Sequence, residues 1–403
     1  MTSGGGKPGI FFEGVDIYGL PGTDSYWNRT VRHVCQELTT AGEACEPLNL
    51  QDSENTKLSF ETADLPPYAI CWNFNSGRWA MYEGERVRII NILPVKNIVL
   101  LWDHPVHLAE TIREMQSFDQ RIDRPPFHIG VMDSGHMDYL REMGIGPERI
   151  FRWRQAGPEP TAETPDFADR EVDYLFHGTI NDVEEFDAFC ARLGITDGAV
   201  QSGLQNAIAA IIETPVDVYT ALRKQVLEPS GWDLDAVAAA PLCRELDRLT
   251  RDIRRFALLT GLKELPVHYI GRVAEGFRAA NPNGVFTGPL PFNEIETYLR
   301  NTKTVLYDTI NFRDAAVMRL FYSIAEGCVP ALEMNAYLSE TFSGGENAVS
   351  LTLGDPGGNT AKLRDMVGSV ETGRRLAEAA RETCRRHHAW RHSIGPLLDA
   401  IRA

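Results

Sequence analysis

Residues 301–333 read NTKTVLYDTINFRDAAVMRLFYSIAEGCVPALE, and this stretch decides the fold. It opens with a run of β-favouring residues at 304–307, of the kind found in parallel strands that are buried on both faces. A polar loop at 308–314 follows, and apolar residues then recur at helical spacing as far as Gly327, which suits a helix C-cap. A second apolar run begins at Val329. The pattern predicts a strand, loop, helix and strand of a parallel sheet, in which ligands bind where strands end and helices begin.

The length and composition favour two domains of a soluble globular protein, because 403 residues exceed one ordinary core and 43% of them are hydrophobic. A formal net charge of −16 argues against a broad surface for nucleic acid or anionic membrane. The seven cysteines form no C-x-x-C pair, which indicates reduced thiols rather than a disulfide framework or a zinc site. No signal peptide or membrane-spanning run is recognisable, so we expect a cytoplasmic protein.

The first half of the chain alternates predicted strands with predicted helices. Strands are expected at residues 10–17, 68–73, 98–102 and 127–132, and helices near 80–90, 107–118 and 136–143. Such alternation is typical of a doubly wound parallel sheet. The loop at 18–25, rich in turn residues, suits either a ligand site or an ordinary turn, with Asp24 or Ser25 as the cap of the next helix.

The second half begins with a proline-rich linker and returns to the same alternation after a long helical region. The expected division is a disordered tail at 1–9, a first α/β domain at 10–156, a linker at 157–170, a second α/β domain at 171–380 with a helical insertion at about 182–262, and a C-terminal helix at 381–403 that packs back towards the first domain. The charged faces of the helical insertion are expected to be solvated.

Two predicted strands of the first half are followed directly by a carboxylate and an imidazole. Asp103 and His104 follow the strand at 98–102, and Asp133 and His136 follow the next. An acid/base pair is expected at this edge of a doubly wound sheet. The structural alternative stays open, because an aspartate before a helix also serves as its N-cap.

Short motifs in both halves resemble the CgeB-like (spore-maturation-protein type) group of GT-B glycosyltransferases. They are spread over roughly residues 98–391, and the helical region at 182–262 carries none of them. The motifs are DHP at 103–105, DSGH at 133–136, DYLFHG at 173–178, GPLPF at 288–292, NTKTVL at 301–306, MRLF at 318–321, EG at 326–327, GGEN at 344–347 and HAW at 388–390.

The resemblance implies two doubly wound, Rossmann-like domains facing a cleft, with the acceptor on the first domain and a nucleotide-sugar donor on the second. The implied reaction moves a sugar to a glycan, protein or small-molecule acceptor without a metal or cofactor. The net charge and the lack of a long apolar run lead us to expect no nucleic-acid partner and no stable membrane insertion. Arg319 is the best candidate to neutralise the departing diphosphate, since the group keeps an arginine there. Gly178 and Thr179 end the first strand of the donor domain, where a backbone can approach phosphate closely.

One position departs from the pattern of many retaining GT-B enzymes, which carry two acidic residues eight positions apart. Here Asp314 occupies the first position and Tyr322 the second, and a phenol offers no bidentate carboxylate to a ribose diol. Glu326 or Glu333 supplies that contact instead, or the nucleotide is held differently, or donor binding is lost. Of these, we prefer Glu333, at a predicted strand end.

An inverting transferase needs a general base to deprotonate the acceptor hydroxyl, whereas a retaining one can rely on the leaving phosphate. If a general base exists, we favour His104, oriented by Asp103 or Asp133, with His136 as a further candidate. A nucleotide-sugar epimerase on the same fold, or a binding protein that has lost donor chemistry, remains an alternative.

This interpretation predicts that His104→Ala abolishes sugar transfer while nucleotide binding survives. The measurement is a transfer assay beside a nucleotide-binding titration of the same variant, and full transfer activity would remove His104 from the mechanism.

Overall fold

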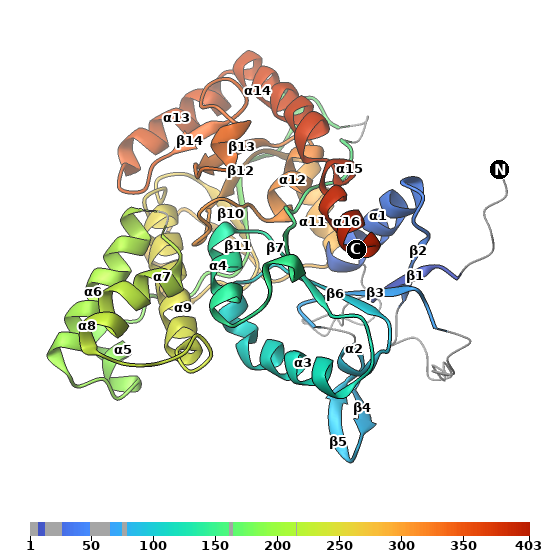
Figure 1. The fold of residues 1–403 in the computed structure, drawn as a ribbon. Helices are drawn as coiled ribbons and strands as arrows, with labels where there is room; N and C mark the ends of the chain where they lie inside the picture. Colours follow the sequence, from blue (N-terminus) through green and yellow to red (C-terminus); the bar gives the residue numbers. More distant parts are fainter. Residues whose placement is uncertain (1–6, 13–25, 49–64, 75–78, 161–163, 215) are drawn as a thin grey trace. The chain divides into compact units, whose positions relative to one another are not determined.

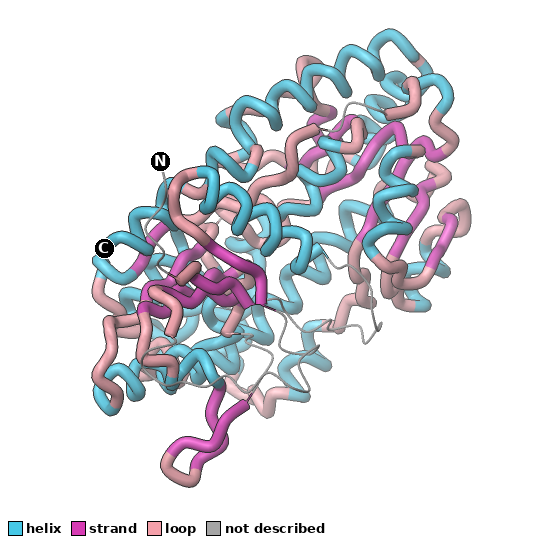
Figure 2. The backbone as a smooth tube through the Cα atoms, turned by 90° about the vertical axis from the view of Figure 1, so that its right-hand side faces the viewer, coloured by secondary structure: helices cyan, strands magenta, loops and turns pink. Residues whose placement is uncertain are grey.

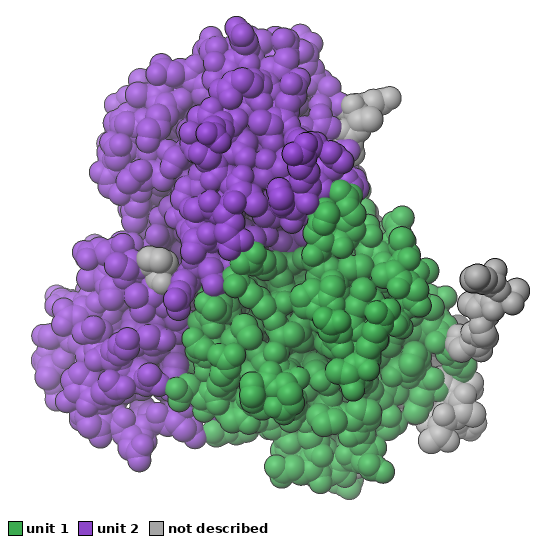
Figure 3. Space-filling model, turned by 45° about the horizontal axis from the view of Figure 1, so that its top comes forward, with its two compact units in different colours: residues 1–154, 390–403 green, residues 155–389 purple. Residues whose placement is uncertain are grey.

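The computed structural model describes residues 7–12, 26–48, 65–74, 79–160, 164–214 and 216–403. The chain forms two compact units: unit 1 comprises residues 1–154 and 390–403, and unit 2 comprises residues 155–389 (Figure 3). Each unit is built on its own sheet, whose strands are drawn in magenta in Figure 2. The expected loop at 18–25, with both of its candidate caps, lies outside the described residues, as does most of the expected tail.

Unit 1 contains a six-stranded sheet in the order β2-β1-β3-β6-β7-β8, in which every neighbouring pair is parallel. Apolar strands such as IVLL at 98–101 are buried, as a sheet covered by helices requires. The strands are β1 (Gly9–Phe12), β2 (Cys45–Leu48), β3 (Tyr68–Trp72), β6 (Lys96–Leu101), β7 (His128–Val131) and β8 (Ile150–Arg152). The helices include α1 (Tyr26–Thr40), α2 (Ile89–Ile92), η2 (Pro105–Leu108), α3 (Ala109–Arg121), α4 (Ser134–Glu142) and η3 (Pro147–Arg149).

The last residues of the chain complete unit 1 with α15 (Trp390–Ser393) and α16 (Gly395–Arg402). The indole of Trp390 stacks on that of Trp153, with ring centroids 5.5 Å apart. Lys96 Nζ donates to the carbonyl oxygen of Ile401 at 2.9 Å. These contacts join the two separate pieces of sequence into one unit.

The helix predicted near residues 80–90 is wrong. The structure has an antiparallel hairpin of β4 (Trp79–Tyr82) and β5 (Glu85–Arg88), and only the short α2 follows it. Its two turn residues, Glu83 and Gly84, both have positive φ values, of 50° and 86°. A two-residue loop with positive φ at both positions matches the right-handed twist of a hairpin, so local turn geometry overrode the apparent helical spacing.

Unit 2 contains a second parallel sheet, in the order β11-β10-β9-β12-β13-β14. Its strands are β9 (Val172–His177), β10 (Val267–Ile270), β11 (Val285–Thr287), β12 (Thr302–Tyr307), β13 (Val329–Glu333) and β14 (Val349–Leu351). Its helices outside the insertion are η4 (Phe167–Asp169), α10 (Glu275–Ala280), α11 (Phe292–Arg300), α12 (Met318–Ala325), η6 (Leu338–Glu340), α13 (Pro356–Gly368), α14 (Val370–Thr383) and η7 (Cys384–His388).

The helical region between β9 and β10 ends in the long helix α9 (Ala240–Thr260), whose residues Leu258 and Leu259 enter the core cluster of the sheet (Figure 1). It is preceded by α5 (Phe186–Arg192), α6 (Gly198–Glu213), α7 (Val218–Leu222), η5 (Arg223–Leu227) and α8 (Glu228–Ser230). The two doubly wound sheets confirm the predicted GT-B fold class. In unit 2, the strand order reverses between β9 and β12, and ligands of such sheets bind outside the carboxyl ends of the strands at that point.

Gly271, just after β10, is expected to tolerate no side chain. Its φ is 132°, and an added Cβ would lie 2.2 Å from the carbonyl oxygen of Gly178. We expect Gly271→Ala to lower the free energy of unfolding by about 2 kcal/mol or more, measured by urea denaturation. Gly288→Ala is the matched control, because a Cβ there would meet nothing within 4 Å. Equal losses in the two variants would contradict the prediction.

Candidate functional site

The carboxyl ends of β9 and β12 form the centre of the candidate site in unit 2. The two strands are parallel neighbours, with Leu175 opposite Val305. His177 ends β9 and is followed by Gly178 and Thr179, while Asp308 follows β12 directly.

Arg319, in the first turn of α12, bridges these two strand ends. Its Nη1 donates to the carbonyl oxygen of His177 at 3.0 Å, and its Nη2 donates to Asp308 Oδ1 at 2.6 Å. The guanidinium carbon lies 5.4 Å from the ring centroid of Phe176 and 5.5 Å from that of Tyr307, within range of cation–π attraction. The side chain is 18% exposed, so the charge is held in a fixed place and still reaches solvent.

Arg255, on α9, makes a second bridge between the same strand ends. Its Nε donates to Asp308 Oδ2 at 2.9 Å, and its Nη1 donates to the carbonyl oxygen of Thr179 at 2.6 Å. Neither Arg255 nor Asp308 was among the predicted site residues. The expectation that the charged faces of the insertion are solvated is wrong for this arginine, whose side chain is 13% exposed. The one available signal was that Asp308 directly follows a predicted strand.

The site carries a surplus of positive charge around one buried carboxylate. Burial alone raises the pKa of Asp308, but the charges of Arg255 and Arg319 outweigh burial and hold that pKa below its ordinary value. Asp308 is therefore ionised, and two guanidiniums face its single negative charge. Burial, and then the charge of Arg319, lower the pKa of His177 to about 3, so its ring is neutral near pH 7.

Glu333 lies at the end of β13, as expected, but its carboxylate is already engaged. Arg254 donates to Glu333 Oε1 from Nη2 at 2.7 Å and from Nε at 3.0 Å. The hydroxyl of Thr309 donates to Oε2 at 3.1 Å. The proposed ribose contact would have to compete with this arrangement.

The other residues considered for the ribose and donor-sugar contacts lie elsewhere in unit 2. Tyr322 is 4% exposed and its ring meets that of Phe292 edge to face at 5.6 Å. Glu326 follows the C-terminal end of α12, away from Arg319 at the start of that helix, and accepts from Arg300 Nε at 2.8 Å. Asp314 is half-buried in the loop between β12 and α12.

Two N–H groups at the start of α12 are taken by protein acceptors. The N–H of Val317 donates to the hydroxyl of Tyr307 at 2.9 Å, and that of Met318 donates to Gln155 Oε1 at 2.7 Å. We expected the first N–H groups of this helix to be available to bind a phosphate, and for these two groups that expectation is wrong. The side chains of the arginines, rather than the helix terminus, present the clearest anion-binding groups.

In unit 1, Asp103 and His104 follow β6 and are held by residue 73 on one side and by η2 on the other. Asn73 has a left-handed φ of 44°, and its Nδ2 donates to Asp103 Oδ2 at 3.3 Å. His104 is buried, and its Nδ1 accepts the N–H of Val106 at 3.1 Å. That bond requires an unprotonated Nδ1, so the neutral ring carries its proton on Nε2. This arrangement does not favour His104 as a general base.

The second predicted pair comes close to the first, but Asp133 has a structural role. Its Oδ1 accepts the N–H of Gly135 at 2.8 Å and caps α4, as the structural alternative holds. The ring of His136 lies 4.5 Å from that of His104, edge to face, and both rings are buried. The structure therefore brings the two histidines together, and leaves Asp103 as the half-buried carboxylate of this edge.

The low pKa of His177 predicts a pH-dependent loss of stability. Between the ordinary pKa of about 6.5 and a folded-state pKa of about 3, the unfolded chain binds a proton that the folded chain refuses. Stability should therefore fall as the pH drops through this window, by at most about 1.4 kcal/mol per pH unit from this group. Urea denaturation from pH 7 to pH 4 should show a shallower fall for His177→Asn, and parallel curves would contradict the assignment.

Comparison with known proteins supports the architecture. Residues 248–399 match the model of a family described as glycosyl transferase-like. No curated protein matches the chain in sequence. An alpha-glucosyltransferase in complex with UDP-glucose and DNA containing an abasic site is similar in structure, with 10% identity and a TM-score of 0.55, over 98% of this chain and 99% of that one.

A second structure of an alpha-glucosyltransferase, in complex with UDP and a 13-mer DNA containing a HMU base, has 11% identity and a TM-score of 0.53, over 99% of this chain and 100% of that one. At such identities the likeness shows the fold. In the described part of the chain, no helix is long and apolar enough to cross a membrane. The protein thus has a GT-B fold, and its residues 248–399 are similar to a family described as glycosyl transferase-like.

Proposed function

We propose that the protein transfers a sugar from a nucleotide-sugar donor, with the diphosphate of the donor bound at the carboxyl ends of β9 and β12. The observation that carries this proposal is the convergence of Arg319 and Arg255 on Asp308 where the strand order reverses. The glycosyl transferase-like match at residues 248–399 supports it, because that range contains all three residues.

The arrangement suits a leaving diphosphate. Negative charge grows on the diphosphate as the bond to the sugar breaks, and fixed guanidiniums stabilise that charge without reorganising at the moment of reaction. Gly178 lets Arg319 pack against the backbone, since an added Cβ would lie 2.6 Å from Arg319 Nη1. We propose that these arginines neutralise the diphosphate without a metal ion.

The nucleoside half of the donor is proposed to be held without a carboxylate from Glu333. Arg254 and Thr309 already occupy that carboxylate, and breaking a buried bidentate pair costs several kcal/mol. Glu333 then fixes the loop after β12 through Thr309, and Asp314 remains a candidate contact for the donor sugar.

On the acceptor side, we propose Asp103 rather than His104 as the group that takes the proton of the acceptor hydroxyl. Asp103 is half-buried and accepts from Asn73, whereas the Nδ1 lone pair of His104 is used by Val106. The acceptor is proposed to be a glycan, protein or small molecule, of the kind that the CgeB-like resemblance implies. The net charge of −16 disfavours nucleic acid, although the similar alpha-glucosyltransferases were solved with DNA.

Replacing Arg319 should weaken donor binding. Arg319→Ala removes one of two guanidiniums and leaves Asp308 paired with Arg255, so we expect UDP to bind about 10- to 100-fold more weakly. Isothermal titration with UDP, and with GDP in case the base differs, measures this. EDTA should leave the wild-type transfer rate unchanged.

The matched control for Arg319→Ala is Arg300→Ala, which removes a 43% exposed arginine that pairs with Glu326. Equal affinities in Arg319→Ala and wild type would remove the diphosphate site from the strand ends. Turnover of a nucleotide sugar to its epimer without any acceptor would favour the epimerase alternative instead.

The acceptor side gives a separate prediction. Asp103→Asn should lower transfer at least 100-fold, because an amide cannot take the proton, and should leave UDP affinity unchanged. His104→Ala is expected to keep more transfer activity than Asp103→Asn, in contrast to the expectation from sequence. The reverse order of activities would restore His104 as the base.

A further inference from the structure

The loop between β12 and α12 contains a backbone conformation that its sequence does not favour. Ile310 has a φ of 53°, in the left-handed region. A branched Cβ crowds the backbone there, so such a residue is a conformational outlier that surrounding contacts must hold in place. The loop begins at Asp308 and leads to Arg319, so its shape sets the spacing of the two charged groups of the candidate site.

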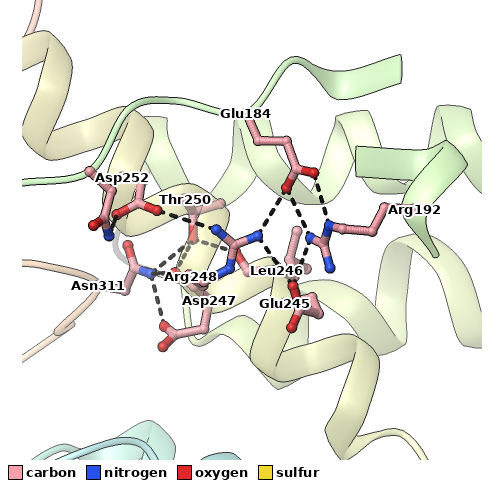
Figure 4. A network of polar contacts seen from close by, with 10 residues as sticks. Glu184, Arg192, Glu245, Leu246, Asp247, Arg248, Thr250, Asp252 and Asn311 are labelled. Atoms are coloured by element: carbon pink, nitrogen blue, oxygen red, sulfur yellow. Dashed lines mark hydrogen bonds and ion pairs between the residues drawn. The ribbon is translucent and has the colours of Figure 1, made fainter. Parts of the chain in front are cut away.

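The next residue, Asn311, anchors this loop to α9. Its Nδ2 lies 2.8 Å from Thr250 Oγ1, 2.9 Å from Asp247 Oδ1 and 3.1 Å from the carbonyl oxygen of Asp247 (Figure 4). Thr250 and Asp247 are buried. Because Asp247 presents only oxygen acceptors here, the amide must face it with its NH₂ group, and an oxygen in that place would be repelled.

α9 also holds the loop after β9. Asp252 Oδ1 accepts from Asn181 Nδ2 at 2.9 Å, and Arg255 donates to the carbonyl oxygen of Thr179. Figure 4 shows Asn311 with Asp247 and Thr250, and Asp252 with Arg248, all but Asn311 lying on this helix. α9 is thus the common support of both loops that border the point where the strand order reverses.

We infer that Asn311 is a positioning residue for donor binding: it holds the loop of Ile310 against α9, so that Asp308 and Arg319 keep the spacing that a diphosphate requires. This inference rests on the proposed function and names a residue that touches no substrate. Without the amide, the backbone at Ile310 relaxes to a negative φ, and the two ends of the loop move relative to each other.

The test compares four variants. Asn311→Ala removes the anchor, and Asn311→Asp puts a carboxylate against Asp247 without changing the size of the side chain. Thr250→Val removes one acceptor with little change in shape, and serves as the milder variant if either Asn311 variant fails to fold. The control is Asn281→Ala, which removes a buried amide that donates to the carbonyl oxygen of Phe277 at 2.9 Å, after α10.

The probes are UDP affinity by isothermal titration, amide hydrogen exchange at residues 308–317, and Tm. We expect at least 10-fold weaker UDP binding for both Asn311 variants and a few-fold loss for Thr250→Val, each with faster exchange at 308–317. Asn281→Ala should lose Tm without losing affinity or changing exchange in this loop.

Ile310→Gly adds a readout that a merely structural role would not move. Glycine adopts the left-handed φ without strain, so its Tm should not fall, yet the loosened loop should bind UDP several-fold more weakly. Unchanged UDP affinity in a folded Asn311→Ala, or an equal loss in Asn281→Ala, overturns the inference. If wild type binds neither UDP nor GDP, the proposed function fails, and the anchor is then judged by exchange alone: unchanged exchange in Asn311→Ala overturns it.

Discussion

The charge balance at Asp308 is the constraint on which the rest of unit 2 depends. A buried carboxylate is costly unless charged donors surround it, and here Arg255 and Arg319 each occupy one of its oxygens. Arg319 also donates to the carbonyl oxygen of His177 at the end of β9, and Arg255 donates to that of Thr179 just after the strand. These contacts tie together four elements, β9, β12, α9 and α12, and so the proposed anion site is held in place by the fold itself.

The helical insertion takes part in this assembly through its last helix. Adjacent residues of α9, Arg254 and Arg255, pair with Glu333 at the end of β13 and with Asp308 at the end of β12. One helix thereby spans neighbouring strand ends. The last helix of the insertion is therefore part of the candidate site.

The fold class was predictable because it depends on apolar periodicity, which the stretch at 301–333 displays clearly. Arg319 was predicted on a different basis, because the glycosyltransferase group that the sequence resembles keeps an arginine at this position. Arg255 was missed because it lies on α9, far from residues 301–333 in the sequence, and the charged residues of that helix follow the pattern of a solvated face. The hairpin at 79–88 escaped because the left-handed turn at Glu83 and Gly84 has no strong sequence signal. That Asp133 caps a helix became visible only through its contact with Gly135.

The split composition of unit 1 has a consequence for biosynthesis. Trp153 rests against Trp390, and Lys96 is tied to Ile401, although all of unit 2 lies between these partners in sequence. During translation, residues 1–154 are made first. Part of their aromatic core, including Trp153, stays exposed until Trp390 and the helices α15 and α16 have been synthesised. Unit 2 is one continuous segment, residues 155–389, and can fold as soon as that segment has been made. Synthesis from the N-terminus therefore favours completion of unit 2 before unit 1.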